Sequence, residues 1–270
     1  MVWKKLARWL TGLLLAGVVA LMFSVGYYLV FPRISALKTG NPGKTSFMEY
    51  REREWEEKGK KIRSQYVWVS LSRISPYLVK AVLIAEDDKF WRHEGFDFEA
   101  IQKAIERDIR ERKLKFGGST ISQQLAKNLY LTPARNPVRK VKEAILTWRL
   151  ERELPKRRIL EIYLNVVEWG EGVFGAEAAA RRYFGTSAAA LSPMEAARLA
   201  TVLPNPRKYS PVGGSRYVEN RSKIIYSIMV RRGVVSPEYE DAAEDGAAES
   251  GDSARSEIEK KVFEITKPQP

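Results

Sequence analysis

Residues 117–128 read Gly117-Gly118-Ser119-Thr120-Ile121-Ser122-Gln123-Gln124-Leu125-Ala126-Lys127-Asn128, and most of their side chains are polar. Thr120 followed three residues later by Gln123 is a capping box, which predicts that a helix begins here. A glycine-rich turn before a helix N-terminus offers free N–H groups and a positive dipole end, which suit a phosphate or pyrophosphate. Ser119, Gln123 and Lys127 fall at i, i+4 and i+8 and would share one face. The stretch therefore predicts an anion-binding helix start, and a well-capped surface helix is the alternative.

Residues 9–31 carry no charged side chain and are long enough to cross a bilayer as one helix. Lys4, Lys5 and Arg8 precede this run, so residues 1–8 should stay in the cytoplasm and the body should lie outside it. A cleaved signal peptide is the alternative. The apolar run is too long for one, and no small-residue cleavage site follows before Pro32. We therefore predict one transmembrane helix over residues 9–31.

Cysteine and histidine usage excludes several kinds of chemistry. The chain has no cysteine, so it has neither disulfides nor thiolates. Its single histidine, His93, excludes most zinc sites and Ser-His-Asp triads, and we interpret it as a hydrogen-bonded structural residue. Any catalysis must therefore use carboxylates, cations, hydroxyls and amides.

The net charge of +13 is distributed unevenly. From Glu238 to the end there are 10 acidic and 4 basic residues, which leaves 42 basic and 23 acidic residues before it. A basic body tethered to a membrane is expected to meet anionic headgroups or phosphate-bearing substrates. Its place outside the cytoplasm argues against nucleic acid as a partner.

The composition along the chain predicts five segments: residues 1–8, the transmembrane helix 9–31, a linker 32–62 with a helical second half, a globular domain 63–235, and an acidic, disordered tail 236–270. The domain should be mainly α. Helices are predicted from Ser75-Pro76, through Ile101, Ile105 and Ile109, through Val141 to Trp148, from Ile159, over 193–202 and over 217–231. The best strand candidate is 66–71.

Glu86 is the first candidate for acid–base chemistry. Val79, Val82, Leu83 and Glu86 lie at i, i+3, i+4 and i+7, so Glu86 shares the apolar stripe near the end of its own helix. Burial and the negative end of the helix dipole should both raise its pKa, as a general base or acid requires. The alternative is a solvated acidic cluster, which is how we interpret the neighbouring Asp88.

Glu143 is the second candidate carboxylate. Arg139 and Glu143 lie at i, i+4 and could form an ordinary surface pair, which contributes little. A functional Glu143 would have to face the same cleft as Glu86. Lys127 and Arg135 are candidate phosphate ligands, Lys as a point charge and Arg as a bidentate fork.

Residues 35–40 contain both S-x-x-K and K-T-G, which are motifs of serine transpeptidases. Here the two motifs share Lys38, beside the membrane, and the chain has no S-D-N and no room for such a domain. We interpret the match as chance and expect no transpeptidase activity.

Five motifs in order resemble the peptidoglycan glycosyltransferase domain of bacterial cell-wall synthases (family 51), above all the monofunctional, membrane-anchored biosynthetic transglycosylases. The resemblance covers about residues 69–229. The motifs are E-D-x-x-F-x-x-H-x-G from Glu86 to Gly95, G-G-S-T-I-T-Q-Q over Gly117–Gln124, R-K-x-x-E over Arg139–Glu143, I-L-E-x-Y-L-N over Ile159–Asn165 and R-x-Y-F-G over Arg181–Gly185. One departure is Ser122 where the family has Thr, which keeps the hydroxyl.

The resemblance implies a lysozyme-like larger lobe and a smaller jaw lobe near the bacterial inner membrane, with the catalytic domain in the periplasm. It implies polymerisation of lipid II into β-1,4-linked glycan by inverting transfer, with release of a lipid pyrophosphate. Glu86 would be the general base, and Glu143 a second catalytic carboxylate that positions the pyrophosphate and its cations or binds a divalent metal. No cofactor is required by the sequence, and Mg²⁺ or Mn²⁺ is the candidate ion.

The same resemblance assigns substrate contacts to Asp87, Gly118, Ser119, Thr120, Gln123, Gln124, Lys127, Asn128, Arg135, Arg139 and Lys140. Phe90, His93 and Asn165 are expected to be architectural. The expected partners are lipid II, the growing strand, the membrane and other cell-wall synthesis or division proteins. Membrane docking of the jaw lobe is expected through Leu114, Phe116 and residues 129–131.

Two other classes of function stay open from the sequence. A membrane-anchored, lysozyme-like muralytic enzyme would also use two carboxylates, but it has no use for cations beside a phosphate-binding turn. A non-catalytic scaffold of a cell-wall synthesis complex would not need Glu86 and Glu143.

Overall fold

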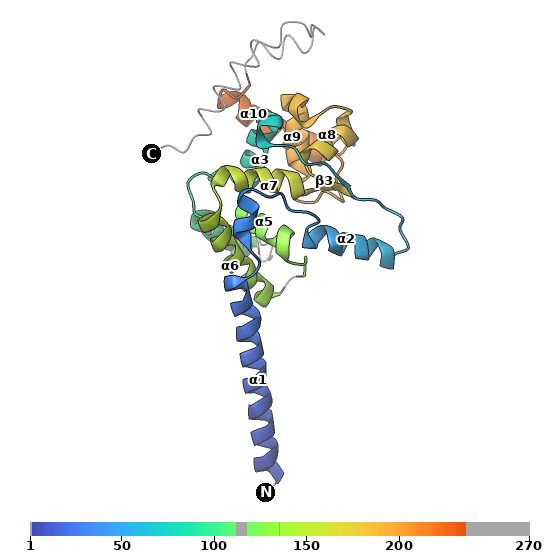
Figure 1. The fold of residues 1–270 in the computed structure, drawn as a ribbon. Coiled ribbons are helices and arrows are strands. Elements are labelled where there is room, and N and C mark those ends of the chain that lie inside the picture. Colours follow the sequence, from blue (N-terminus) through green and yellow to red (C-terminus); the bar gives the residue numbers. More distant parts are fainter. Residues whose placement is uncertain (1, 112–117, 135, 236–270) are drawn as a thin grey trace, which may run out of the picture.

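The computed structural model describes residues 2–111, 118–134 and 136–235. The described part is mainly helical, as predicted, with one small sheet (Figure 1). Its helices are α1 Val2–Val30, α2 Ser46–Glu57, α3 Pro76–Glu86, α4 Phe98–Glu111, α5 Ile121–Tyr130, α6 Pro137–Glu153, α7 Lys156–Val166, α8 Ala176–Phe184, α9 Pro193–Val202 and α10 Arg216–Arg231. Short 3₁₀ turns lie at Ile34–Lys38, Leu71–Arg73 and Ala188–Ala190. The expected tail, 236–270, lies outside the described residues.

The sheet contains three short strands in the order β1-β3-β2, formed by Gln65–Tyr66, Val173–Phe174 and Glu168–Gly170. β1 pairs parallel to β3, and β2 pairs antiparallel to β3. The predicted strand over 66–71 is therefore too long. The backbone of Val69 bonds instead to the side chain of Asn165, whose Oδ1 accepts from the amide N–H and whose Nδ2 donates to the carbonyl, both at 2.9 Å. Asn165 is architectural, as the resemblance implies.

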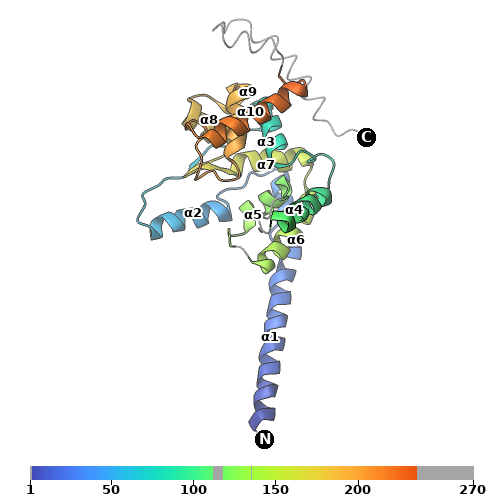
Figure 2. The same cartoon turned by 180° about the vertical axis from the view of Figure 1, so that it is seen from behind.

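The body is organised around α7, which is buried on nearly every side. Ile159, Ile162, Tyr163 and Leu164 are each fully inaccessible to solvent. Figure 1 shows α3, α8, α9 and α10 grouped beyond α7, and α5 and α6 between α7 and α1. Figure 2 shows α4 from behind, on the same side as α5 and α6. This second group is the one nearest the predicted membrane.

Helix α1 projects from the body as a single rod (Figures 1 and 2). The apolar segment beginning at Trp9 has a mean hydropathy of 2.2 and is long enough to span a membrane. The end of α1 packs on α6. Lys142 Nζ donates to Ser24 Oγ at 2.7 Å, and Arg149 Nη1 donates to the Tyr28 carbonyl oxygen at 3.1 Å. The end of α1 is therefore attached directly to the body.

Residues 32–62 are not a free linker. Ile34, Met48 and Trp55 are at most 1% exposed and belong to the main core, so the body begins well before residue 63. The helical second half is confirmed as α2, which begins after Thr45, whose side chain accepts from the Met48 amide at 3.2 Å. The charged side chains of Glu49, Arg53, Glu56 and Glu57 are exposed. Such dense charge concealed the core residues Met48 and Trp55 of α2 from sequence analysis.

The structure also places two sets of apolar residues differently from expectation. Leu129 and Leu131 are each 5% exposed, so they pack in the core and cannot dock on a membrane; Leu114 and Phe116 lie outside the described residues. Helix α4 forms as predicted, but its apolar stripe faces outward, with Ile105 and Ile109 being 55% and 73% exposed.

Candidate active site

The start of α5 is built as the capping box predicts. Thr120 Oγ1 accepts from the Gln123 amide at 3.2 Å, and Gln123 Oε1 accepts from the Thr120 amide at 3.0 Å. Gly118 has a φ of +102°, and a Cβ there would lie 3.1 Å from the Ala100 carbonyl oxygen, so only glycine fits. Thr120 is buried and donates to the Gly95 carbonyl at 2.7 Å. Its hydroxyl is therefore used within the protein and does not face a substrate.

Asp87 was expected to contact substrate, but the structure places it inside the protein. Its carboxylate accepts from the Ile121 amide at 2.9 Å and lies 2.9 and 3.1 Å from His93 Nε2. Because the Gly95 amide donates to His93 Nδ1 at 3.0 Å, the Nε2 carries the proton that points at Asp87. Asp87 therefore fastens the α5 N-terminus to the end of α3. The structural interpretation of His93 is confirmed.

Glu86 ends α3 and is partly buried. Its Oε2 accepts from Gln124 Nε2 at 2.7 Å, and Gln124 Oε1 accepts from the Tyr163 hydroxyl at 3.0 Å. Burial raises the pKa of Glu86, as predicted, while the Gln124 hydrogen bond and the nearby cations Arg221 and Lys127 oppose that rise. Gln124, to which the resemblance assigned a substrate contact, thus also binds Glu86.

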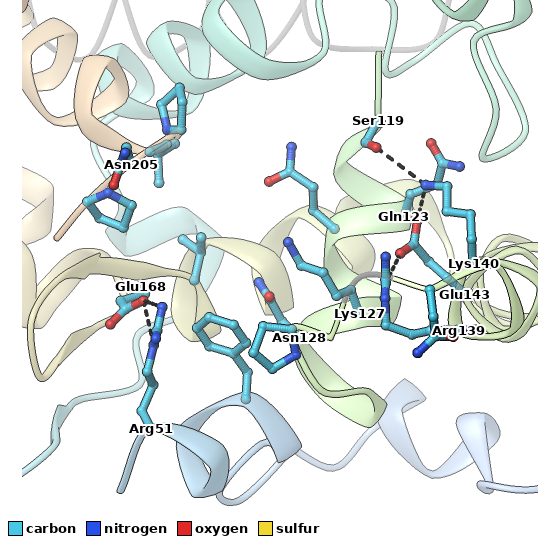
Figure 3. A pocket seen from close by; sticks show the side chains of 18 of the residues that line it. Arg51, Ser119, Gln123, Lys127, Asn128, Arg139, Lys140, Glu143, Glu168 and Asn205 are labelled. Atoms are coloured by element: carbon cyan, nitrogen blue, oxygen red, sulfur yellow. Dashed lines mark hydrogen bonds and ion pairs between the residues drawn. The ribbon is translucent and has the colours of Figure 1, made fainter. Parts of the chain in front are cut away.

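A cleft of about 1070 Å³ opens between α5, α6, α2 and the loop 203–207 (Figure 3). Seven of the predicted contacts and Glu143 line it: Ser119, Gln123, Gln124, Lys127, Asn128, Arg139 and Lys140. A smaller hollow of about 280 Å³ adjoins it and is lined by Glu86, Asp87 and residues 118–120. Ser119 borders both spaces, so the two candidate carboxylates open onto adjoining parts of one site.

Lys127 points into the cleft in Figure 3. Among the residues that the structure describes, it has no hydrogen-bond or ion-pair partner. Burial lowers its pKa, and the carboxylates of Glu143 and Glu86 oppose that effect. Lys127 therefore lies within electrostatic reach of both carboxylates and is available for an anionic ligand.

Glu143 is 3% exposed, so it is not the ordinary surface partner of Arg139. Its Oε2 accepts from Arg139 Nη1 at 2.5 Å, and its Oε1 is paired with Lys140 Nζ. Lys140 Nζ also donates to Ser119 Oγ at 3.5 Å. With Lys127, this end of the cleft carries three cations and one carboxylate, and it can therefore neutralise a bound anion.

Glu143 is also the candidate metal ligand of the cleft. Both oxygens of Glu143 are already engaged by cations, so a metal would have to displace Arg139 or Lys140. No group of three His, Cys, Asp or Glu side chains that could hold a metal occurs among the described residues. Arg135, the other predicted phosphate ligand, lies outside the described residues.

Several cleft residues could not have been found from the sequence: Phe47, Arg51, Glu168, Asn205 and Arg207. Arg51 Nη2 donates to Glu168 Oε2 at 3.0 Å across 117 positions of the chain. No local spacing signals such a pair, because only tertiary packing brings α2 beside β2.

Comparison with known proteins places the chain in the same family as the motifs do. The transglycosylase family model matches residues 54–230. The biosynthetic peptidoglycan transglycosylase of Azoarcus sp. (strain BH72) is 50% identical over 221 residues, which cover 82% of this chain and 95% of that protein. The protein of the same name from Dechloromonas aromatica (strain RCB) is 48% identical over 231 residues, 84% of this chain and 97% of that protein. The chain therefore belongs to the transglycosylase family, as its motifs predict.

Proposed function

We propose that this chain polymerises lipid II into β-1,4-linked glycan strands of peptidoglycan by inverting glycosyl transfer, releasing lipid pyrophosphate. The observation that carries the proposal is the juxtaposition of Glu86, a desolvated carboxylate, with a cleft end where Lys127, Arg139 and Lys140 gather. The names of its relatives, biosynthetic peptidoglycan transglycosylases, support it.

Glu86 is the general base. It accepts the proton of the acceptor sugar's 4-hydroxyl while that oxygen attacks the anomeric carbon of the donor. The bond from this carbon to the pyrophosphate oxygen breaks, and attack from the opposite face inverts the centre. The base must be ionised to accept a proton, and a pKa raised toward the operating pH makes it a stronger base in that form.

The pyrophosphate needs charge neutralisation more than protonation as it leaves. Lys127 is unpaired among the described residues, and Glu143 holds Arg139 and Lys140 in place. Fixed cations of this kind stabilise developing negative charge without reorganising at the moment of reaction. Ser119, the Gln123 amide nitrogen and the Asn128 amide complete the donor site, with Arg135 as a further phosphate ligand. The chemistry proposed here routes no step through a metal.

The substrate is lipid-linked, which accords with a single-pass anchor over residues 9–31, a cytoplasmic N-terminus and a periplasmic body. The exposed stripe of α4, Phe98, Ile105 and Ile109, replaces residues 129–131 as the surface that meets the bilayer. We propose no transpeptidase activity, because Ser35 and Lys38 lie in a single short 3₁₀ turn.

The decisive experiment supplies purified full-length protein with lipid II and separates the products by length. We expect polymer from the wild type and a rate at least about 100-fold lower from Glu86→Gln. A Glu86→Gln protein that polymerises at the wild-type rate would refute the base assignment. A wild type that degrades finished glycan and builds none would establish the muralytic alternative. A wild type that neither builds nor degrades glycan would favour the non-catalytic scaffold.

A further inference from the structure

The outer face of α10 carries a row of cations that no carboxylate balances. Arg216, Lys223 and Arg231 lie seven and eight residues apart, close to two helical turns each, so they follow one side of the helix. All three side chains are exposed, and none has an ion-pair partner among the residues that the structure describes. We call these three residues the α10 stripe.

The stripe is not placed to meet the membrane predicted around α1. Both views show α10 on the far side of α7 from α1 (Figures 1 and 2). Anionic headgroups attract cations only within about a Debye length of the bilayer surface, roughly 8 Å at physiological salt. A partner that balances the stripe must therefore come from elsewhere than the lipid.

The chain itself supplies a segment of opposite charge. Residues 238–252 contain seven acidic residues and no basic one. The acidic residues are Glu238, Glu240, Asp241, Glu244, Asp245, Glu249 and Asp252. The match to the family model ends at residue 230, so this acidic segment lies outside what the family model describes.

The end of α10 fixes where the acidic segment begins. Gly233 has a φ of +66° and donates its amide to the Val230 carbonyl at 2.9 Å, while the Val234 amide donates to the Met229 carbonyl at 3.0 Å. This pair of hydrogen bonds is a Schellman motif, which ends the helix and turns the chain. Val234 and Val235 are 1% and 2% exposed and belong to the core. The chain therefore leaves the body beside the end of α10 that carries Arg231.

The acidic segment is long enough to reach the whole stripe. Residues 238–252 can extend over at most about 50 Å, whereas the 16 residues of α10 rise only about 24 Å. Only residues 236 and 237 separate the acidic segment from the buried Val235. So short a tether keeps the segment at an effective concentration in the millimolar range beside α10.

We propose that the acidic segment, residues 238–252, binds along the α10 stripe, running back from Arg231 toward Arg216. Its carboxylates pair with the three cations, and any other anionic partner of this face has to displace it. Single exposed ion pairs are weak and are screened by salt, so the docking depends on several pairs acting together. It involves no residue of the cleft and does not depend on the chemistry proposed there.

The test follows the mobility of a spin label in the acidic segment of the full-length protein, held one chain per nanodisc of zwitterionic lipid. The chain has no cysteine, so Ser250→Cys provides a single attachment point. At about 0.05 M salt the label should be largely immobilised. At about 1 M salt, where the Debye length is about 3 Å, it should become mobile.

Charge reversal on the helix locates the contact. The variant carries Arg216→Glu, Lys223→Glu and Arg231→Glu. An exposed ion pair contributes roughly twofold to fivefold to such an equilibrium, so losing three should weaken docking at least about eightfold and free the label at low salt. Adding Glu240→Lys, Glu244→Lys and Glu249→Lys to that variant should restore at least part of the immobilisation.

A matched control makes the same change of net charge elsewhere on the body. It carries Arg53→Glu, Arg73→Glu and Arg182→Glu, at exposed residues without an ion-pair partner among the described residues. The label should stay immobilised in this control, and thermal unfolding verifies that both triple variants are folded.

A label that is mobile in the otherwise unchanged chain at low salt would overturn the docking. So would a label that stays immobilised after reversal of the α10 stripe, because the segment would then bind another surface. Immobilisation that weakens when the nanodiscs are diluted would show that the segment binds a second copy, and would overturn docking within one chain.

Discussion

Gln124 donates a hydrogen bond from Nε2 to Oε2 of Glu86 at 2.7 Å. The orientation of the Gln124 amide is fixed from its other side, because Tyr163, which is fully buried, donates its hydroxyl proton to Gln124 Oε1 at 3.0 Å. The candidate base is therefore held by a chain of two residues, from α5 and α7. This arrangement controls both the direction of the carboxylate and its pKa.

Removing the Gln124 donor should shift the pH dependence of the reaction. The hydrogen bond from Gln124 lowers the pKa of Glu86, so Gln124→Leu should raise it. Because the base acts in its ionised form, the acid limb of kcat/KM should move to higher pH. Rates measured across pH with lipid II test this. Tyr163→Phe, which only frees the amide to rotate, should shift the limb in the same direction by less. An unmoved limb in both variants would contradict the arrangement.

Glu86→Gln should stabilise the protein while it inactivates the enzyme. Burial raises the folded-state pKa of Glu86 above its ordinary value of 4.5. Between that value and the folded pKa, the folded state retains a proton that the unfolded state has lost, so stability falls as the pH rises through this window. Glu86→Gln removes this loss of stability. Its Tm should exceed that of the wild type at neutral pH, and the difference should disappear below pH 4.5. A lower Tm at neutral pH would count against this.

Truncation of two adjacent aspartates should destabilise the protein by very different amounts. Asp87→Ala removes the acceptor of the His93 and Ile121 hydrogen bonds and should cost about 3 kcal/mol of unfolding free energy. Asp88 is 50% exposed, and among the described residues its ion-pair partner is Arg232 at the surface. Asp88→Ala should therefore cost less than about 1 kcal/mol. Urea unfolding measures both. Equal losses would show that Asp87 does not fasten α5 to α3.

Lys127→Met should impair catalysis without destabilising the fold. Lys127 is a largely buried cation that has no ion-pair partner among the described residues, so its removal breaks no internal bond. Loss of one fixed charge at the leaving group should lower kcat/KM by roughly 100- to 1,000-fold. The control is Lys44→Met, at an exposed pair with Glu52 that is not part of the cleft lining. A decrease in kcat/KM no larger than that of the control would show that Lys127 does not act at the donor site.

The sequence predicted best what short-range geometry specifies. The capping box of Thr120 and Gln123 placed the start of α5, and the i, i+3, i+4 and i+7 stripe placed Glu86 against the core. It failed where a residue's partner is distant. Residues 32–62 looked like a linker because charges dominate them, yet Trp55 is in the core. The sequence also did not reveal that Asp87 and Gln124, both assigned to substrate, bind other parts of the chain.

By itself, the sequence determined the family, a helix long and apolar enough to span a membrane, and the residue types available for catalysis, since these follow from motifs, hydropathy and composition. Only the tertiary structure decided which polar side chains face a ligand. Helical spacing tells which residues share a face, but not which element packs against that face. The position of α5 beside the end of α3 and the loop that follows it committed Thr120, Asp87 and Gln124 to internal hydrogen bonds. It left Lys127 open to the cleft, and it brought Arg51 of α2 to the end of that cleft.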